Sequence, residues 1–188
     1  LCIILYLQED IKNMKLLVHL HIYYHNQVDY MLKKLKNIKS IDYDLYVTVS
    51  ETNENTEKKL LKFKPDTNII KIDNFGYDVF PFCEVLRIVN LDNYDYILKI
   101  HTKAKRNMFY FCQNDKYFFG YAWRNLLISA LIGSKKRFED NIKLFQADET
   151  CGMIGYTNLL TYSKYEAVVN RPATNYLKKK YNLSLDNT

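Results

Sequence analysis

Short segments rich in apolar and β-branched residues alternate along the chain with segments whose apolar residues recur at helical spacing. In residues 28–38, for example, Val28, Met31, Leu35 and Ile38 fall on one face, so we expect an amphipathic helix there. The predicted strands are residues 15–22, 42–49, 68–72 and 94–100, and the predicted helices between them are residues 28–38, 55–62 and 79–89.

Strand and helix alternation of this kind is typical of a mainly parallel sheet with helices on both faces, so the fold class is α/β. After residue 100 the pattern is less regular. There we expect an irregular loop over 105–116, a long apolar helix over 118–132, a second helix over 135–145, a short strand within 150–156, and helices over 164–170 and 173–181.

The composition narrows the possible classes of protein. With 48% hydrophobic and 15% aromatic residues, the chain can form a core and is not typical of disorder. Its net charge of +6 suits contact with phosphates or an anionic membrane face, but the lysines are scattered, so a nucleic-acid arm is not indicated. Four cysteines without a Cys-x-x-Cys pair (Cys2, Cys83, Cys112 and Cys151) predict free thiols in a reducing compartment.

The first residues give no targeting signal. The apolar stretch 2–7 is too short to span a bilayer, and no cationic region precedes it. We expect a cytoplasmic protein, and contact with the inner face of the membrane stays open. Because the chain begins with Leu1 rather than Met, we expect a fragment of a longer protein.

The most informative residues are His101, Thr102 and Lys103, which directly follow the apolar strand of residues 94–100. Open α/β sheets bind their ligands at the carboxyl ends of the strands. Since buried charge is costly, we expect His101 and Lys103 to lie outside the core. Lys103 would pair with a phosphate, His101 would donate to a phosphate oxygen and Thr102 would donate a hydroxyl hydrogen bond. A strand end that simply reaches solvent would give the same pattern.

A second candidate is the turn of residues 73–78, between the third predicted strand and a helix. Gly76 permits a positive φ and a close approach of the backbone to a ligand. Asp78 is placed to cap the following helix, whose free N–H groups could bind a phosphate or a sugar hydroxyl. An ordinary strand-to-helix turn explains the same residues.

Other polar residues have weaker signals. His19 and His21 alternate on one strand and share a face, which predicts a hydrogen-bonded pair rather than a metal site, because no third ligand is near in sequence. His25, in the next turn, is the best placed of the three histidines to reach a ligand. Trp123 and Arg124 fit a buried aromatic residue with a salt-bridged arginine, or alternatively a wall of the site.

Several segments, in order, resemble the rhamnan synthesis protein F family, which comprises bacterial glycosyltransferase-like proteins of cell-wall and lipopolysaccharide rhamnan assembly. The most specific segments are the run 94–103, which ends in His-Thr-Lys, and residues 74–82, which contain an Asn-x-Gly-x-Asp turn. The resemblance covers roughly residues 15 to 183. The other matching segments are 18–24, 43–49, 123–124 with 131–134, and 152–155.

The resemblance implies a glycosyltransferase A fold, that of nucleotide-diphospho-sugar transferases, over residues 15–183. It would be incomplete at its C-terminus, with an N-terminal extension (1–14) and a polar tail (184–188). Most such enzymes hold a divalent metal through an Asp-x-Asp motif after the fourth strand, where this chain has His101-Thr102-Lys103. We therefore expect no metal or other cofactor, with Lys103 neutralising the leaving diphosphate. Phe75 and Tyr77 replace two arginines of the family turn, so two candidate cations are missing.

The implied function is transfer of a sugar, such as the deoxyhexose rhamnose, from a nucleotide-diphosphate donor to a cell-surface polysaccharide. The expected partners are the nucleotide sugar and a polysaccharide or lipid-linked oligosaccharide acceptor, without nucleic acid, and no catalytic base is identified. The alternative is a non-catalytic carbohydrate-binding or scaffold domain. The predicted substrate-binding residues are Asn74, Gly76, Asp78, His101, Thr102, Lys103 and His25.

Overall fold

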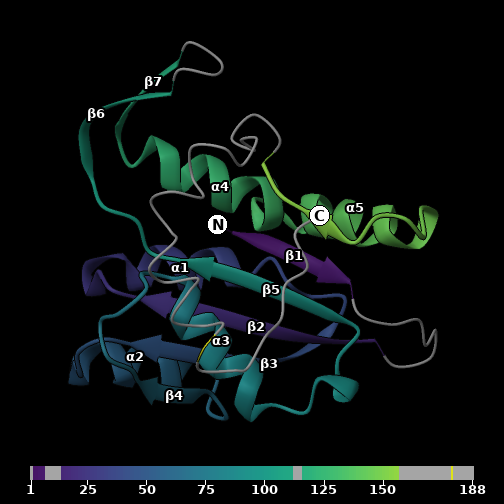
Figure 1. Ribbon diagram of the computed structural model, residues 1–188, viewed down its shortest axis with the longest axis horizontal. Helices are drawn as coiled ribbons and strands as arrows, with labels where there is room; N and C mark the ends of the chain where they lie inside the picture. The colour runs from purple at the N-terminus through teal and green to yellow at the C-terminus, as the bar shows by residue number, and fades with distance from the viewer. Residues whose placement is uncertain (1, 7–13, 112–115, 157–178, 180–188) are drawn as a thin grey trace.

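Four parallel strands form the centre of the fold in the computed structural model, which describes residues 2–6, 14–111, 116–156 and 179. They lie side by side in the order β4-β3-β2-β5 and pair in parallel (Figure 1). This confirms the predicted α/β class and the four predicted strands. Their bounds are β2 (Lys15–Ile22), β3 (Asp42–Val49), β4 (Asn68–Lys71) and β5 (Tyr96–His101).

Two further strands complete a six-stranded sheet. β1 (Ile3–Tyr6) pairs antiparallel with β5 on one side and with β8 (Met153–Ile154) on the other. The sequence pattern did not predict β1, because four residues are too few to show a period. Residues 3–6 therefore belong to the same sheet as the parallel strands, whereas the sequence prediction assigned residues 1–14 to an N-terminal extension. The other domain bounds stay predictions.

The helices that connect the parallel strands begin and end close to their predicted positions. They are α1 (Val28–Leu35), α2 (Glu54–Phe63) and α3 (Val79–Ile88), and two short 3-10 helices, η1 (His25–Gln27) and η2 (Leu91–Asn93), accompany them. Asn53 caps α2, because its side chain accepts the backbone N–H of Thr56 at 3.0 Å. The predicted helix over 28–38 is shorter, since regular helix ends at Leu35.

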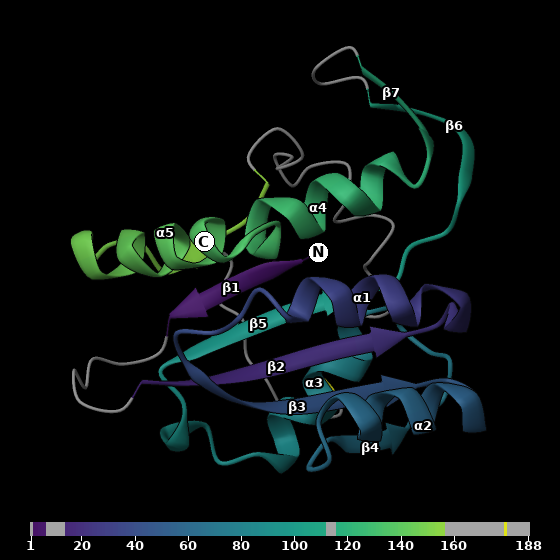
Figure 2. The ribbon, with the colours of Figure 1, turned by 180° about the vertical axis from the view of Figure 1, so that it is seen from behind.

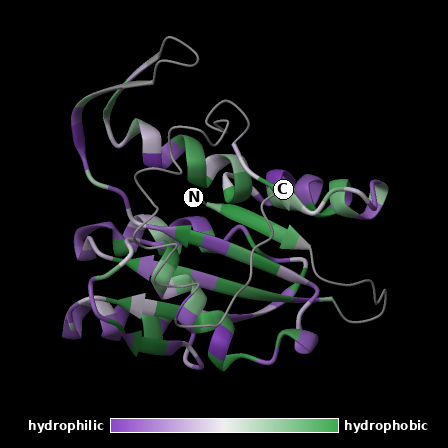
Figure 3. Cartoon of the chain, viewed as in Figure 1, coloured by the Kyte–Doolittle hydropathy of each residue, from purple (hydrophilic) through white to green (hydrophobic). Residues whose placement is uncertain are grey.

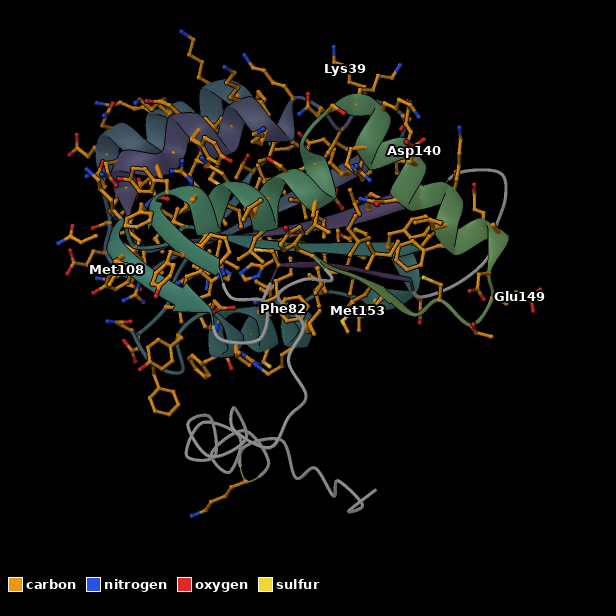
Figure 4. All side chains as sticks on the ribbon, turned by 90° about the horizontal axis from the view of Figure 1, so that it is seen from above. Lys39, Phe82, Met108, Asp140, Glu149 and Met153 are labelled. Atoms are coloured by element: carbon orange, nitrogen blue, oxygen red, sulfur yellow. The ribbon has the colours of Figure 1, made fainter. Side chains whose placement is uncertain are left out.

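Helices cover both faces of the sheet, as predicted. The larger hydrophobic cluster joins one face of the sheet to α1, α2, α4 and α5, and the smaller cluster joins the other face to α3. Figure 2 shows α1 and α2 in front of the sheet and α3 behind it. Figure 4 shows Phe82 of α3 and Lys39, which follows α1, on opposite sides of the sheet. Hydrophobic residues concentrate along the central strands (Figure 3).

The segment after β5 differs from its prediction. The expected loop over 105–116 is instead part of an antiparallel hairpin of β6 (Arg106–Phe111) and β7 (Lys116–Gly120). The following helix α4 (Ala122–Ile132) consequently begins four residues later than expected. Gly133 ends α4, and Ser134 caps α5 (Lys135–Ala147) by accepting the N–H of Arg137 at 3.1 Å.

Some predictions fall on residues that the structure does not describe. The helix expected over 164–170 lies outside the described residues, as does that over 173–181 apart from Lys179. Cys2, Cys83 and Cys151 are free thiols, as predicted, and Cys112 lies outside the described residues. Within the described part of the chain, no helix combines the length and apolar character needed to cross a membrane.

Candidate functional site

A cavity of about 320 Å³ opens at the carboxyl ends of β2 and β5. The loops that follow β2, β4 and β5 all contribute to its wall, which is the position expected for a ligand site in an α/β sheet. It brings together five of the seven predicted substrate-binding residues. The described residues that line it are His21, Tyr23, Tyr24, Asn74, Tyr77, Asp78, His101, Thr102, Lys103, Ala104, Arg106 and Trp123.

The strand register places the polar residues near the cavity on one face of the sheet. His19 pairs with Lys99 across β2 and β5, and His21 pairs with His101. Because successive residues of a strand face opposite sides, all four side chains lie on the face that α3 covers. Phe82 of α3 lies over them, with its ring stacked on His19 at 5.5 Å between centroids and 5.7 Å from the Lys99 ammonium.

Asp78 connects this face to the turn before α3. Its carboxylate forms a short ion pair with the Lys99 ammonium, and its Oδ2 lies 3.2 Å from Nδ1 of His101. The Lys99 side chain is 4% exposed, so the pair neutralises a buried charge. Asp78 occupies the N-cap position of α3, but its side chain makes no capping hydrogen bond. The predicted capping role is therefore wrong, because the carboxylate is used in the ion pair.

The protonation states of this group follow from burial and charge. Burial acts to raise the pKa of Asp78, but the Lys99 ammonium outweighs it, so the pKa lies far below its usual value and the carboxylate is ionised. Burial lowers the pKa of His101 well below its usual value, although Asp78 acts in the opposite direction. His101 is consequently neutral at pH 7. Nδ1 lies 3.2 Å from Oδ2 of Asp78 and 3.8 Å from Sγ of Cys2. The ionised carboxylate favours the tautomer that has its hydrogen on Nδ1.

This arrangement changes the predicted role of His101. The ring is 2% exposed, so the expectation that His101 would lie outside the core is wrong; a neutral ring avoids the cost of a buried charge. Its Nε2 is buried and has no hydrogen-bond partner among the described residues. With the hydrogen on Nδ1, Nε2 is an acceptor. In that tautomer it accepts a hydroxyl hydrogen, whereas the predicted donation to a phosphate oxygen requires the hydrogen on Nε2.

His19 and His21 are linked as a hydrogen-bonded pair, as predicted, but through the hydroxyl of Thr48 rather than directly. Nε2 of His19 and Nδ1 of His21 lie 2.9 and 3.0 Å from Oγ1 of Thr48 on β3. Since one hydroxyl has a single hydrogen, Thr48 donates to one imidazole and accepts from the other. Burial lowers the pKa of His19 well below its usual value and that of His21 to about 4. Both rings are therefore neutral at pH 7.

Thr102 joins the ends of β2 and β5. Its Oγ1 accepts the backbone N–H groups of Tyr23 and Tyr24 at 3.0 and 3.1 Å, and its own N–H donates to the carbonyl of His21 at 3.0 Å. The hydroxyl thus positions the loop after β2, which supplies two aromatic side chains to the cavity wall. Donation of its hydroxyl hydrogen to a ligand stays a prediction.

Lys103 lies on the side of the cavity that faces α4. Its ammonium lies 4.7 Å from the ring centroid of Trp123, and its carbonyl accepts Nε2 of Gln27 at 2.7 Å. Trp123 therefore lines the site, one of its two predicted roles. Arg124 is buried, but its partners are Oε1 of Gln27, the Asn125 amide and the rings of Tyr30 and Tyr121, in place of the salt bridge that was expected.

The turn before α3 has two residues in the left-handed region. Gly76 has φ +63°, and a Cβ there would lie 2.8 Å from Cβ of Phe80, so glycine is required for both reasons. Tyr77 has φ +54° with a full side chain. Asn74 and Tyr77 line the cavity, whereas Gly76 shapes the turn without lining it.

His25 is the predicted site residue that the structure places elsewhere. Its Nδ1 lies 3.0 Å from Oγ1 of Thr56 in α2, and it is not among the described residues that line the cavity. Three residues in or beside the site were not predicted from the sequence. One is Lys99, and its signal was a charged side chain inside the apolar run 96–100, which indicates a buried partner. The other two are Tyr23 and Tyr24, and their signal was that both directly follow β2.

Comparison with known proteins gives one match. The family model of rhamnan synthesis protein F matches residues 3–187, which includes every strand and helix described above. Neither a curated protein nor a solved structure matches the chain significantly. The match also includes β1, which the resemblance drawn from the sequence did not reach. Because the model covers nearly the whole length, the chain belongs to the rhamnan synthesis protein F family.

Proposed function

We propose that this protein is a glycosyltransferase that transfers a sugar of the rhamnose type from a nucleotide diphosphate to a growing polysaccharide. The observation that supports this most is the cavity at the carboxyl ends of β2 and β5, where Lys103 and Arg106 meet hydrogen-bonding groups and aromatic rings. Cations suit the diphosphate of such a donor, and rings and amides suit its sugar and base.

Membership in the rhamnan synthesis protein F family implies a role in polysaccharide biosynthesis. The donor, the transfer step and the glycosyltransferase A fold go beyond that membership and are part of the proposal. The parallel strands, with helices on both faces and a cavity at their carboxyl ends, support such a fold. We place the reaction in the cytoplasm, at the inner face of the membrane, where a lipid-linked acceptor would be available.

In this proposal Lys103 and Arg106 bind the diphosphate and stabilise the charge that develops as it leaves. Electrostatic stabilisation of the leaving group is the main requirement of such a reaction. His101, whose Nε2 is an acceptor, binds a hydroxyl of the transferred sugar. Asp78 fixes the ring of His101 through Nδ1, so its role there is positioning.

A divalent cation does not fit the described residues of this site. Asp78 is the sole carboxylate among the described residues that line the cavity, and it already pairs with the Lys99 ammonium. A cation placed on Asp78 would be repelled by Lys99 at close range. No cluster of three or more histidine, cysteine, aspartate or glutamate side chains suited to a metal occurs within the described ranges. The proposed mechanism therefore includes no step through a metal.

The experiment is calorimetric titration with deoxythymidine-diphospho-rhamnose, with and without magnesium. We expect binding without magnesium, and an affinity about tenfold lower in Lys103→Ala, because one charge-assisted contact to phosphate is lost. Lys105→Ala is the matched control, since Lys105 is exposed and is not among the described lining residues. Binding that requires magnesium would contradict the metal-free site, and unchanged affinity in Lys103→Ala would contradict the role of Lys103.

One observation favours a second candidate, a non-catalytic carbohydrate-binding domain. Transfer to a hydroxyl needs a base, and Asp78 is a poor one, because its pKa lies far below the usual value. A turnover assay separates the two candidates. Release of the nucleoside diphosphate from the donor, with an acceptor present, supports the enzyme, whereas binding of donor and acceptor without any release supports the binding domain.

A further inference from the structure

Tyr77 has a combination of properties that a structural role does not explain. Its backbone lies in the left-handed region, with φ +54°, where side chains with a Cβ are strained. Its side chain is 77% exposed and makes no ring contact or hydrogen bond with any other described residue. Neither packing nor backbone preference therefore accounts for a tyrosine at this position, and strained positions of this kind cluster at functional sites.

The position of Tyr77 supplies a reason. It lines the cavity, together with Asn74 of the same turn and Tyr23 from the loop after β2. Tyr23 is itself 47% exposed, although its backbone is fixed by the hydrogen bond to Thr102. Two tyrosine rings that are held by ordered backbone and left open to water form a preorganised surface at the mouth of the cavity.

We propose that Tyr77 and Tyr23 bind a pyranose ring of the acceptor saccharide at this mouth. The proposal rests on the proposed function for the class of ligand. A pyranose has an apolar face of C–H groups and an edge of hydroxyls. A tyrosine ring covers the apolar face, and the exposed amide of Asn74 offers both donors and acceptors to the hydroxyls.

The openness of the mouth favours a saccharide over the nucleobase of the donor. A nucleobase gains most when both of its faces are covered, whereas Tyr77 stays mostly exposed to water. A growing polysaccharide must leave the cavity through its mouth, and its hydrophilic chain tolerates the solvent there. The cations Lys103 and Arg106 line the same cavity and hold the diphosphate in the proposed function, so donor and acceptor would share it.

The test uses four variants and two probes, a rhamnose trisaccharide and deoxythymidine-diphospho-rhamnose, with affinities measured by titration in NMR. Tyr77→Ala removes the ring and keeps the strain, whereas Tyr77→Gly removes both. We expect each to bind the trisaccharide about three- to tenfold more weakly. Tyr77→Phe should bind it as the wild type does. Tyr117→Ala, which removes an exposed tyrosine of β7 outside the described lining, is the control.

Thermal melting of the same variants gives an independent readout. Tyr77→Gly should keep a Tm at or above that of the wild type, because relief of the strained φ offsets the added freedom of the unfolded chain. Weaker trisaccharide binding without loss of stability supports the proposal. The proposal is overturned if Tyr77→Gly binds the trisaccharide with wild-type affinity while donor binding persists. It is also overturned if the variants lose affinity for the donor alone. If the wild type binds neither probe, the proposed function fails as well.

Discussion

Replacing Asp78 by asparagine should strongly destabilise the protein, although only one oxygen is exchanged for an amide nitrogen. The change removes the partner of Lys99, whose side chain is 4% exposed beneath α3. An asparagine can still accept a hydrogen bond, but it cannot neutralise an ammonium. The neutral His19, which pairs with Lys99 across the strands, and the nearby ring of Phe82 do not replace a carboxylate.

The magnitude follows from the burial of the two partners. Removing one member of a buried ion pair costs about 3–5 kcal/mol, because the other charge is left uncompensated. The Asp78 side chain is 16% exposed, so water can partly solvate the site, and we expect a loss near 3 kcal/mol. For a chain of this size that corresponds to a fall in Tm of about 6–12 °C.

The measurement is equilibrium unfolding in urea as a double-mutant cycle of Asp78→Asn, Lys99→Met and the pair. The double variant should recover most of the lost stability, since no charge is left buried alone. Asp140→Asn is the control. It breaks the Lys136–Asp140 pair of 2.8 Å on the surface of α5, and its effect should lie within error. A double variant no more stable than Asp78→Asn would refute the reasoning, because Lys99 would then not depend on Asp78.

Three further predictions concern the same part of the fold. His21 has a pKa of about 4 when folded and near 6.5 when unfolded, and the pKa values of the other two histidines of this face are also lowered. The unfolded chain therefore binds more protons than the folded chain below pH 6.5. The unfolding free energy should fall from pH 6.5 toward pH 4 by up to about 1.4 kcal/mol per pH unit for each ring. An unfolding free energy in urea that does not change with pH would contradict the burial of neutral histidines. Gly76→Ala should cost about 1–2 kcal/mol in thermal melts, and more than Gly120→Ala, because both have positive φ but only Gly76 also meets Phe80. Thr102→Val should speed hydrogen exchange of the two amides after β2 that its hydroxyl accepts, whereas Thr102→Ser should not; equal exchange rates in both would exclude this role.

Much of the fold could be predicted because the parallel strands are rich in apolar and β-branched residues and the helices are amphipathic. β2 and β3 begin and end where their patterns indicate. The hairpin of β6 and β7 was missed because apolar runs without alternation fit a strand and a helix equally well. Two aromatic runs separated by the polar residues of 112–115 were a hairpin signal. β1 was missed because its stability comes from pairing with β5, which no local pattern contains.

The site was predicted in position but not in its chemistry. His101, Thr102 and Lys103 could be placed at a strand end from the sequence, since the apolar run stops there. Asp78 and Lys99, which form the ion pair, are 21 positions apart in the sequence. They meet only because the folded sheet fixes the position of Lys99 on β5 beneath α3. The neutral state of His101 follows from its burial, and its tautomer follows from the nearby Asp78 carboxylate. Neither the burial nor that contact could be derived from the sequence.

The two faces of the sheet explain why the cavity lies where it does. On the side of α1 and α2, β2 is apolar to its end at Ile22. On the side of α3, the same strand starts at the partly exposed Lys15, continues with the buried Leu17 and changes to histidine at residues 19 and 21. Polarity therefore rises toward the carboxyl edge on one face alone. That face is covered by α3, whose preceding turn supplies Asp78 to the buried ion pair and Tyr77 to the mouth of the cavity. Because one turn serves both, a ligand that binds at the mouth should also stabilise the ion pair beneath it.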